Sequence, residues 1–127
     1  MVEHQSPKWL VLDGYEDEPA AFGVPPYVGF HIRYLCGVLD QHNIHYQYMT
    51  IDQWRELVRA KGESGIAELM ASVDGFACIA GAVVPGKYLR GTPISVREMK
   101  DVVRALPGEI PAILGGWAIR GWRQQGW

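Results

Sequence analysis

The strongest constraint on the fold is an alternation of four short apolar runs with three segments of helical periodicity. The apolar runs cover residues 9–12, 45–50, 75–82 and 111–114. Each run has the length of a strand, and turn-forming residues follow several of them. Strands that alternate with helices build parallel sheets through right-handed crossovers. The sequence therefore predicts an α/β domain with the element order β-α-β-α-β-α-β.

The segments between these runs show the 3.6-residue spacing of amphipathic helices. Residues 29–41 carry one apolar face, made of Ile32, Leu35, Cys36 and Leu39. Residues 52–73 carry a second, made of Trp54, Leu57, Val58, Ile66, Leu69 and Met70. The glycines within 61–65 predict either a break in this second helix or two consecutive helices. Ser95 and Glu98 form a capping box that opens a third helix, which we expect to end near Leu106.

We expect a flavodoxin-like (Rossmann-like), three-layer parallel sheet with the strand order 2-1-3-4. In such a sheet, ligands bind outside the carboxyl ends of the strands, at the switch point between strands one and three. Glycines follow these ends at Gly14, Gly81 and the pair Gly115-Gly116. Glycine there permits a positive φ angle and lets a ligand approach the backbone closely. Because a fifth strand and its helix are missing, we expect residues 1–127 to be one domain of a longer protein.

Composition narrows the class of protein. The net charge is −2, so nothing favours electrostatic binding to nucleic acid or membranes. No apolar run approaches the roughly 20 residues of a membrane span, and the amino-terminal residues lack the features of a signal peptide. Cys36 and Cys78 lie in apolar surroundings and are interpreted as reduced core residues of a cytoplasmic protein.

Several strings of the sequence together resemble one archaeal family. They are Asp13-Gly14-Tyr15, Asp17-Glu18-Pro19, Gly23-Val24-Pro25-Pro26, the segments 48–55 and 86–93, and Leu114-Gly115-Gly116. The family comprises the cobalamin-binding-domain/radical S-adenosylmethionine proteins of methanogens and their relatives, often labelled Fe-S oxidoreductases. The resemblance covers nearly the whole chain, as the amino-terminal domain of such a protein.

The resemblance implies a cobalamin-binding-type domain in front of a radical S-adenosylmethionine barrel. The barrel would hold a 4Fe-4S cluster through a Cys-x3-Cys-x2-Cys motif, which this chain lacks. A cluster needs three or four thiolates, and the chain has two cysteines. The cluster and S-adenosylmethionine are therefore expected only in the missing carboxyl-terminal part. The domain would present a corrinoid or a docking face to the barrel, its expected partner, without being catalytic itself.

The resemblance places the cobalamin-contacting residues on three segments of the rim. They are Asp13, Gly14, Tyr15, Gly81, Lys87, Tyr88, Gly115, Gly116 and Trp117. In the common cobalamin pattern, Asp-x-His-x-x-Gly, a histidine ligates cobalt, and in this chain Tyr15 stands at that position. Asp13 has a second interpretation, as the start of an Asx turn that ends the first strand. Catalytic residues and metal ligands are not expected among these residues.

Other polar residues have weaker claims to a site. The acidic run Glu16-Asp17-Glu18 is interpreted either as oxygen ligands for a metal or as solvated carboxylates. His31 and Arg33 open the first helix, where an anion could bind. His42 and His45 are expected at the opposite edge of the sheet, either exposed to solvent or partly packed.

Two other functions remain open at this point. The chain could be a degenerate domain that serves only interdomain packing or self-association as a homo-oligomer, which the aromatic residues of its loops and carboxyl-terminal end favour. It could also be a stand-alone flavodoxin-like nucleotide-binding module. The sequence contains neither Gly-x-Gly-x-x-Gly after the first strand nor a P-loop, which counts against this second alternative.

Overall fold

The computed structural model describes residues 8–15, 30–81 and 93–116, and these residues form the predicted order of elements. The elements are β1 (Lys8–Gly14), α1 (Phe30–Gln41), β2 (His45–Thr50), α2 (Ile51–Met70), β3 (Gly75–Ala80), α3 (Val96–Ala105) and β4 (Ala112–Gly115). The predicted sites at Lys87, Tyr88 and Trp117, and the acidic run 16–18, lie outside the described residues.

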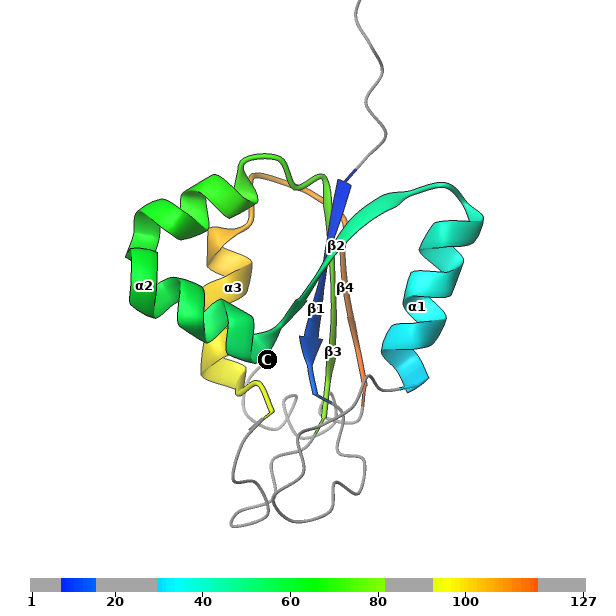
Figure 1. Cartoon of the computed structure of the whole chain (residues 1–127), viewed down its shortest axis with the longest axis horizontal. Coiled ribbons are helices and arrows are strands. Elements are labelled where there is room, and N and C mark those ends of the chain that lie inside the picture. The colour runs from blue at the N-terminus through cyan, green and yellow to red at the C-terminus, as the bar shows by residue number, and fades with distance from the viewer. Residues whose placement is uncertain (1–7, 16–29, 82–92, 117–127) are drawn as a thin grey trace, which may run out of the picture.

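The sheet is parallel throughout, with the order β2-β1-β3-β4, so the flavodoxin-like α/β fold is confirmed. Helix α1 covers one face, and α2 and α3 cover the other (Figure 1). The register pairs Asp13 with both Thr50 and Ile79, and it pairs Ile79 with Gly115. The ends of all four strands therefore lie at one edge of the sheet, which we call the carboxyl rim.

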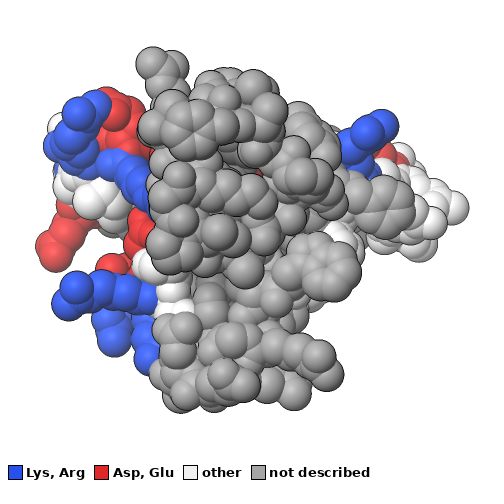
Figure 2. Space-filling view, turned by 90° about the horizontal axis from the view of Figure 1, so that it is seen from below, with Lys and Arg blue, Asp and Glu red and all other residues white. Residues whose placement is uncertain are grey.

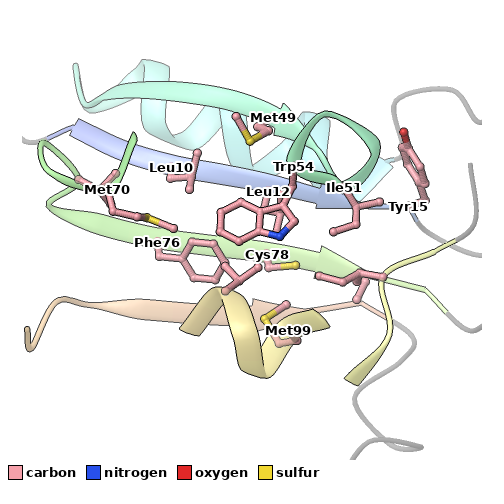
Figure 3. Packing of buried hydrophobic residues seen from close by; sticks show 14 of the residues in the cluster. Leu10, Leu12, Tyr15, Met49, Ile51, Trp54, Met70, Phe76, Cys78 and Met99 are labelled. Carbon is pink, nitrogen blue, oxygen red and sulfur yellow. The ribbon is translucent and has the colours of Figure 1, made fainter. Parts of the chain in front are cut away.

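The larger core lies between the sheet and helices α2 and α3 (Figure 3). Its side chains come from alternate strand positions, such as Leu10 and Leu12, and from one face of each helix, such as Trp54 and Met99. Val11 of β1 and Ile79 of β3 pack instead with α1, in a smaller core on the opposite face of the sheet. Central strands of a parallel sheet are covered on both faces, which explains why β1 and β3 are continuous apolar runs.

Helix α2 breaks where the glycines predicted a break. Gly62 has φ 59° and ψ −147° within the helix, a conformation that glycine adopts without a steric penalty. The prediction that Val58 lies on the core face was wrong, because its side chain is 42% exposed at a hollow between α2 and α3. A capping box at Thr50 and Gln53 opens α2, and the sequence reading missed it.

The predicted capping box of α3 is present, with Ser95 accepting from the Glu98 amide and Glu98 accepting from the Ser95 amide. Both cysteines are free thiols on opposite faces of the sheet, with Cys78 in the larger core and Cys36 against the smaller one. In the described part of the chain, no helix combines the length and the apolar character needed to cross a membrane.

Candidate functional site

Asp13 is the buried polar residue at the centre of the carboxyl rim. Its side chain is only 2% exposed. Its Oδ1 accepts a hydrogen bond from the Tyr15 amide at 3.0 Å, and its Oδ2 accepts one from the Tyr48 hydroxyl at 2.5 Å. The first bond closes an Asx turn at the end of β1, so the turn interpretation of Asp13 is confirmed. Both carboxylate oxygens therefore have partners within the domain.

Tyr15 turns back into the domain after β1. It has a φ angle of 63°, in the left-handed region that few residues other than glycine adopt. Its ring belongs to the larger core and is 9% exposed, and its hydroxyl donates to Asp52 Oδ2 at 2.9 Å. The Tyr15 carbonyl accepts from the Gly81 amide at 2.8 Å, which ties the end of β1 to the residue after β3.

The hydroxyls of both rim tyrosines resist ionisation. Burial raises the pKa of Tyr15 to about 12, and the Asp52 carboxylate adds to the shift. Burial and the hydrogen bond to Asp13 raise the pKa of Tyr48 far above its ordinary value. Both hydroxyls are consequently protonated donors at neutral pH rather than acids or nucleophiles.

Arg55 joins the rim to helix α3. Its Nε and Nη2 donate to the two oxygens of Glu98 at 2.7 and 2.9 Å, which is the strong bidentate geometry of a guanidinium and a carboxylate. Its Nη1 donates to Asp52 Oδ1 at 3.0 Å, and Nη2 also donates to the Pro93 carbonyl at 3.3 Å. Burial alone would raise the pKa of Glu98, but the bonds from Arg55 and Ser95 outweigh burial and lower it.

These bonds connect into one chain of residues across the rim, from β2 through β1 and α2 to α3, in which Asp13 is joined to the backbone amide of Tyr15. We call it the rim network. Its members are Tyr48, Asp13, Tyr15, Asp52, Arg55 and Glu98. The bonds of Asp13 and Tyr15 satisfy polar groups that burial removes from water, whereas the bond between Arg55 and Asp52 is exposed. The rim network therefore joins β1, β2, α2 and α3 through hydrogen bonds within the domain.

The rim glycines contact the domain itself. A Cβ atom added at Gly116, whose φ is 102°, would lie 2.2 Å from the carbonyl oxygen of Ala80. One added at Gly14 would lie 2.4 Å from Cγ2 of Ile94, whose amide donates to the Gly14 carbonyl at 3.0 Å. At both positions the close approach that glycine allows is made by the protein's own residues.

The other predicted residues in the described ranges occupy the expected places. Gly115 ends β4 at the rim, and Gly81 is buried beside Tyr15. His31 is partly buried and lies in the first turn of α1, which begins at Phe30. His42 and His45 are exposed at the amino edge of the sheet, as predicted.

The sequence reading missed Tyr48, Asp52 and Arg55 as rim residues. All three lie in the segment 48–55, which carried part of the family resemblance. The available signal was a Tyr at the end of a strand followed by an Asp and an Arg three residues apart in the first turns of a helix. That spacing puts Asp52 and Arg55 on one side of α2.

The described part of the rim carries both acidic and basic side chains. No group of three or more His, Cys, Asp or Glu residues in the described ranges could hold a metal ion. Seen toward the rim, acidic and basic side chains lie intermixed at the side of α2 and α3 (Figure 2). The rim network holds three carboxylates, Asp13, Asp52 and Glu98, and one guanidinium, Arg55, which is paired with Asp52 and Glu98.

Comparison with known proteins finds relatives in archaea. An uncharacterized protein of Methanocaldococcus jannaschii is 41% identical over 107 residues, which are 84% of this chain and 18% of that protein. An uncharacterized protein of Archaeoglobus fulgidus is 42% identical over 92 residues, 72% of this chain and 16% of that protein. The chain thus spans less than a fifth of either relative. No family model and no solved structure matches it.

Proposed function

We propose that this chain is the non-catalytic amino-terminal domain of a radical S-adenosylmethionine protein, and that its carboxyl rim docks against the catalytic barrel. The family resemblance supports the barrel as partner, and the length of the archaeal relatives supports a larger protein around this domain. The observation that carries the docking role is the internally satisfied rim network. A surface ordered before binding loses less conformational entropy when a partner docks on it.

Cobalamin, the cofactor that the resemblance implies, fits the described rim residues poorly. Tyr15 stands where the common pattern has a cobalt-ligating histidine, and its ring lies in the core with its hydroxyl on Asp52. Asp13 is buried with both oxygens engaged, and Ile94 and Ala80 fill the space beside the rim glycines. We therefore propose the docking face, rather than a presented corrinoid, as the role of this rim.

The docking role can be tested by thiol labelling of the intact parent protein, meaning the full-length protein that contains this domain. Cysteines introduced by Arg33→Cys in α1 and Arg97→Cys in α3 lie near the rim, whereas Gln41→Cys and Glu109→Cys lie toward the opposite edge. All four positions are exposed in the domain. Maleimide labelling, mapped by peptide mass, is compared between the parent and the 127-residue chain.

We expect labelling at 33 and 97 to be about tenfold slower in the parent than in the isolated chain, with little change at 41 and 109. Equal rates at all four positions would contradict docking through the rim. Titration of the parent with hydroxocobalamin tests the cofactor separately. We expect no stoichiometric binding, and a one-to-one complex would restore the corrinoid role.

A further inference from the structure

Strand β2 forms an outer edge of the sheet. Among the described strands it pairs only with β1, so its other side has no strand partner. Its sequence, His45–Thr50, contains no Lys, Arg, Asp, Glu or Pro. Natural edge strands usually carry such residues, because they prevent another strand from pairing with the exposed backbone. The edge of β2 lacks that protection.

Two adjacent hollows run beside this edge, between β2 and α2. Their volumes are about 350 and 300 Å³, and both are lined by Gln47, Met49, Leu57 and Lys61. The first hollow also touches Tyr48, whose side chain points to the opposite face of the sheet from Gln47 and Met49. It therefore reaches the backbone edge of β2 as well as the side chains beneath α2.

The position of the hollows suits an added strand, because Gln47 and Met49, alternate residues of β2, line both of them. Alternate side chains of a strand point to one face and are roughly 7 Å apart, since each residue advances about 3.3 Å. Apolar side chains line the groove, namely Met49 and Leu57 in both hollows and Leu69 in the second. Two alternate apolar side chains of an added strand would contact these residues while its backbone pairs with β2.

The charges around the hollows favour an acidic occupant. Lys61 borders both hollows, and Lys8 borders the second, where its Nζ donates to the uncharged Ser72. The acidic Glu56 of the first hollow is paired with Arg59. Glu68 also lines the second hollow and offsets one of the two lysines, so one positive charge remains along the groove for an acidic side chain to neutralise.

A second copy of the chain fits this groove less well. The β2 strand of a second copy would direct His45, Gln47 and Met49 to this face. Met49 is 91% buried in its own core and is not free to enter a neighbour, and the other two side chains are polar. Pairing two β2 strands would therefore leave the apolar hollows facing polar groups.

The geometry points to strand addition at the edge of β2, with an extended acidic segment that carries two alternate apolar side chains as the occupant. This site is separate from the carboxyl rim and does not depend on rim docking. The affinity would come from main-chain hydrogen bonds, and the selectivity from the two hollows and Lys61.

A matched pair of short peptides tests this inference on the 127-residue chain. The probe is fluorescein-labelled Glu-Val-Thr-Leu-Glu, whose apolar residues share one face when extended. Its control, Glu-Val-Leu-Thr-Glu, has the same composition, but its apolar residues point to opposite faces. Fluorescence anisotropy measures the affinity of each peptide. We expect the probe to bind about tenfold more tightly than the control.

Two tryptophan substitutions on α2 form the second matched pair. Ala60→Trp fills the first hollow, whereas Ala67 is also exposed on α2 and lines neither hollow. We expect Ala60→Trp to weaken probe binding about tenfold and Ala67→Trp to leave it within about twofold. Lys61→Glu should also weaken it, more at low salt.

Three results would each overturn the inference. They are no saturable binding of the probe, equal binding of both peptides, and equal effects of the two tryptophan substitutions. Sedimentation that shows dimers lost on Ala60→Trp would assign the edge to a second copy instead.

Discussion

Replacing Gly116 by alanine tests whether the protein requires glycine at this position for its own packing or for contact with a ligand. The added Cβ would lie 2.2 Å from the carbonyl oxygen and 2.8 Å from the nitrogen of Ala80. Both atoms belong to the backbone of β3, which cannot move aside as the end of a flexible side chain can. We expect Gly116→Ala to destabilise the domain even when no ligand is present.

The size of the effect follows from three terms. A φ of 102° costs a residue with a Cβ about 1–2 kcal/mol. Forcing an extra methyl group into a packed site costs roughly another 1–3 kcal/mol. The lower entropy of the unfolded alanine chain returns about 0.4–1 kcal/mol. The free energy of unfolding should therefore fall by about 1–4.5 kcal/mol, which can be a large part of the stability of a small domain.

Urea unfolding followed by far-UV circular dichroism measures this loss. Gly37→Ala is the matched control, because a Cβ at this position within α1 meets no heavy atom within 4 Å. That variant should be stabilised by about 0.5–1 kcal/mol, since alanine favours the helix. If Gly116→Ala leaves the unfolding midpoint unchanged, the contact with β3 is not what requires glycine, and a ligand becomes the better reason.

Three further predictions concern titratable groups. In a double-mutant cycle of urea unfolding, Arg55→Met and Glu98→Gln should show a coupling free energy of about 1 kcal/mol or more, because the pair is bidentate and half-buried. Additive effects of the two substitutions would contradict this prediction. The folded-state pKa of Glu98 is lowered, so its contribution to stability is present above its unfolded pKa of about 4.3 and is lost as the pH falls through the lower folded value. The urea midpoint should therefore fall less steeply with acid in Glu98→Gln than in the unchanged protein. The pKa of Tyr15 is raised to about 12, so its contribution to stability is present below its unfolded pKa of about 10 and is lost as the pH rises toward 12. In a pH titration followed by tyrosinate absorbance, Tyr15→Phe should lose a component that titrates late.

Local sequence patterns were sufficient to predict most of the elements. The period of the apolar residues distinguishes strands from helices without knowledge of the partner. The Ser95 capping box and the break at Gly62 were also visible, because each depends on residues only a few positions apart. Val58 was misplaced because its spacing is compatible with either edge of the apolar face, and only the position of α3 decides which edge is buried.

The rim could be located from the sequence, but its chemistry could not be read. The parallel order requires that Asp13 and the rim glycines meet at one edge. Whether Asp13 contacts a ligand or closes a turn depends on the partners of its two oxygens. One of them, Tyr48, is 35 residues away, and only the register of β1 with β2 brings it close.

By itself, the sequence determined the α/β class, the parallel order and the edge at which a site would lie, because these follow from periodicity and from chain connectivity. The tertiary structure alone decided that the polar residues of this edge satisfy one another. The bond of Tyr15 to Asp52 spans 37 residues and that of Arg55 to Glu98 spans 43. No local pattern encodes such pairs, since the first depends on how α2 packs at the end of β1 and the second on how α2 packs beside α3. The same packing brings the Ala80 backbone against Gly116.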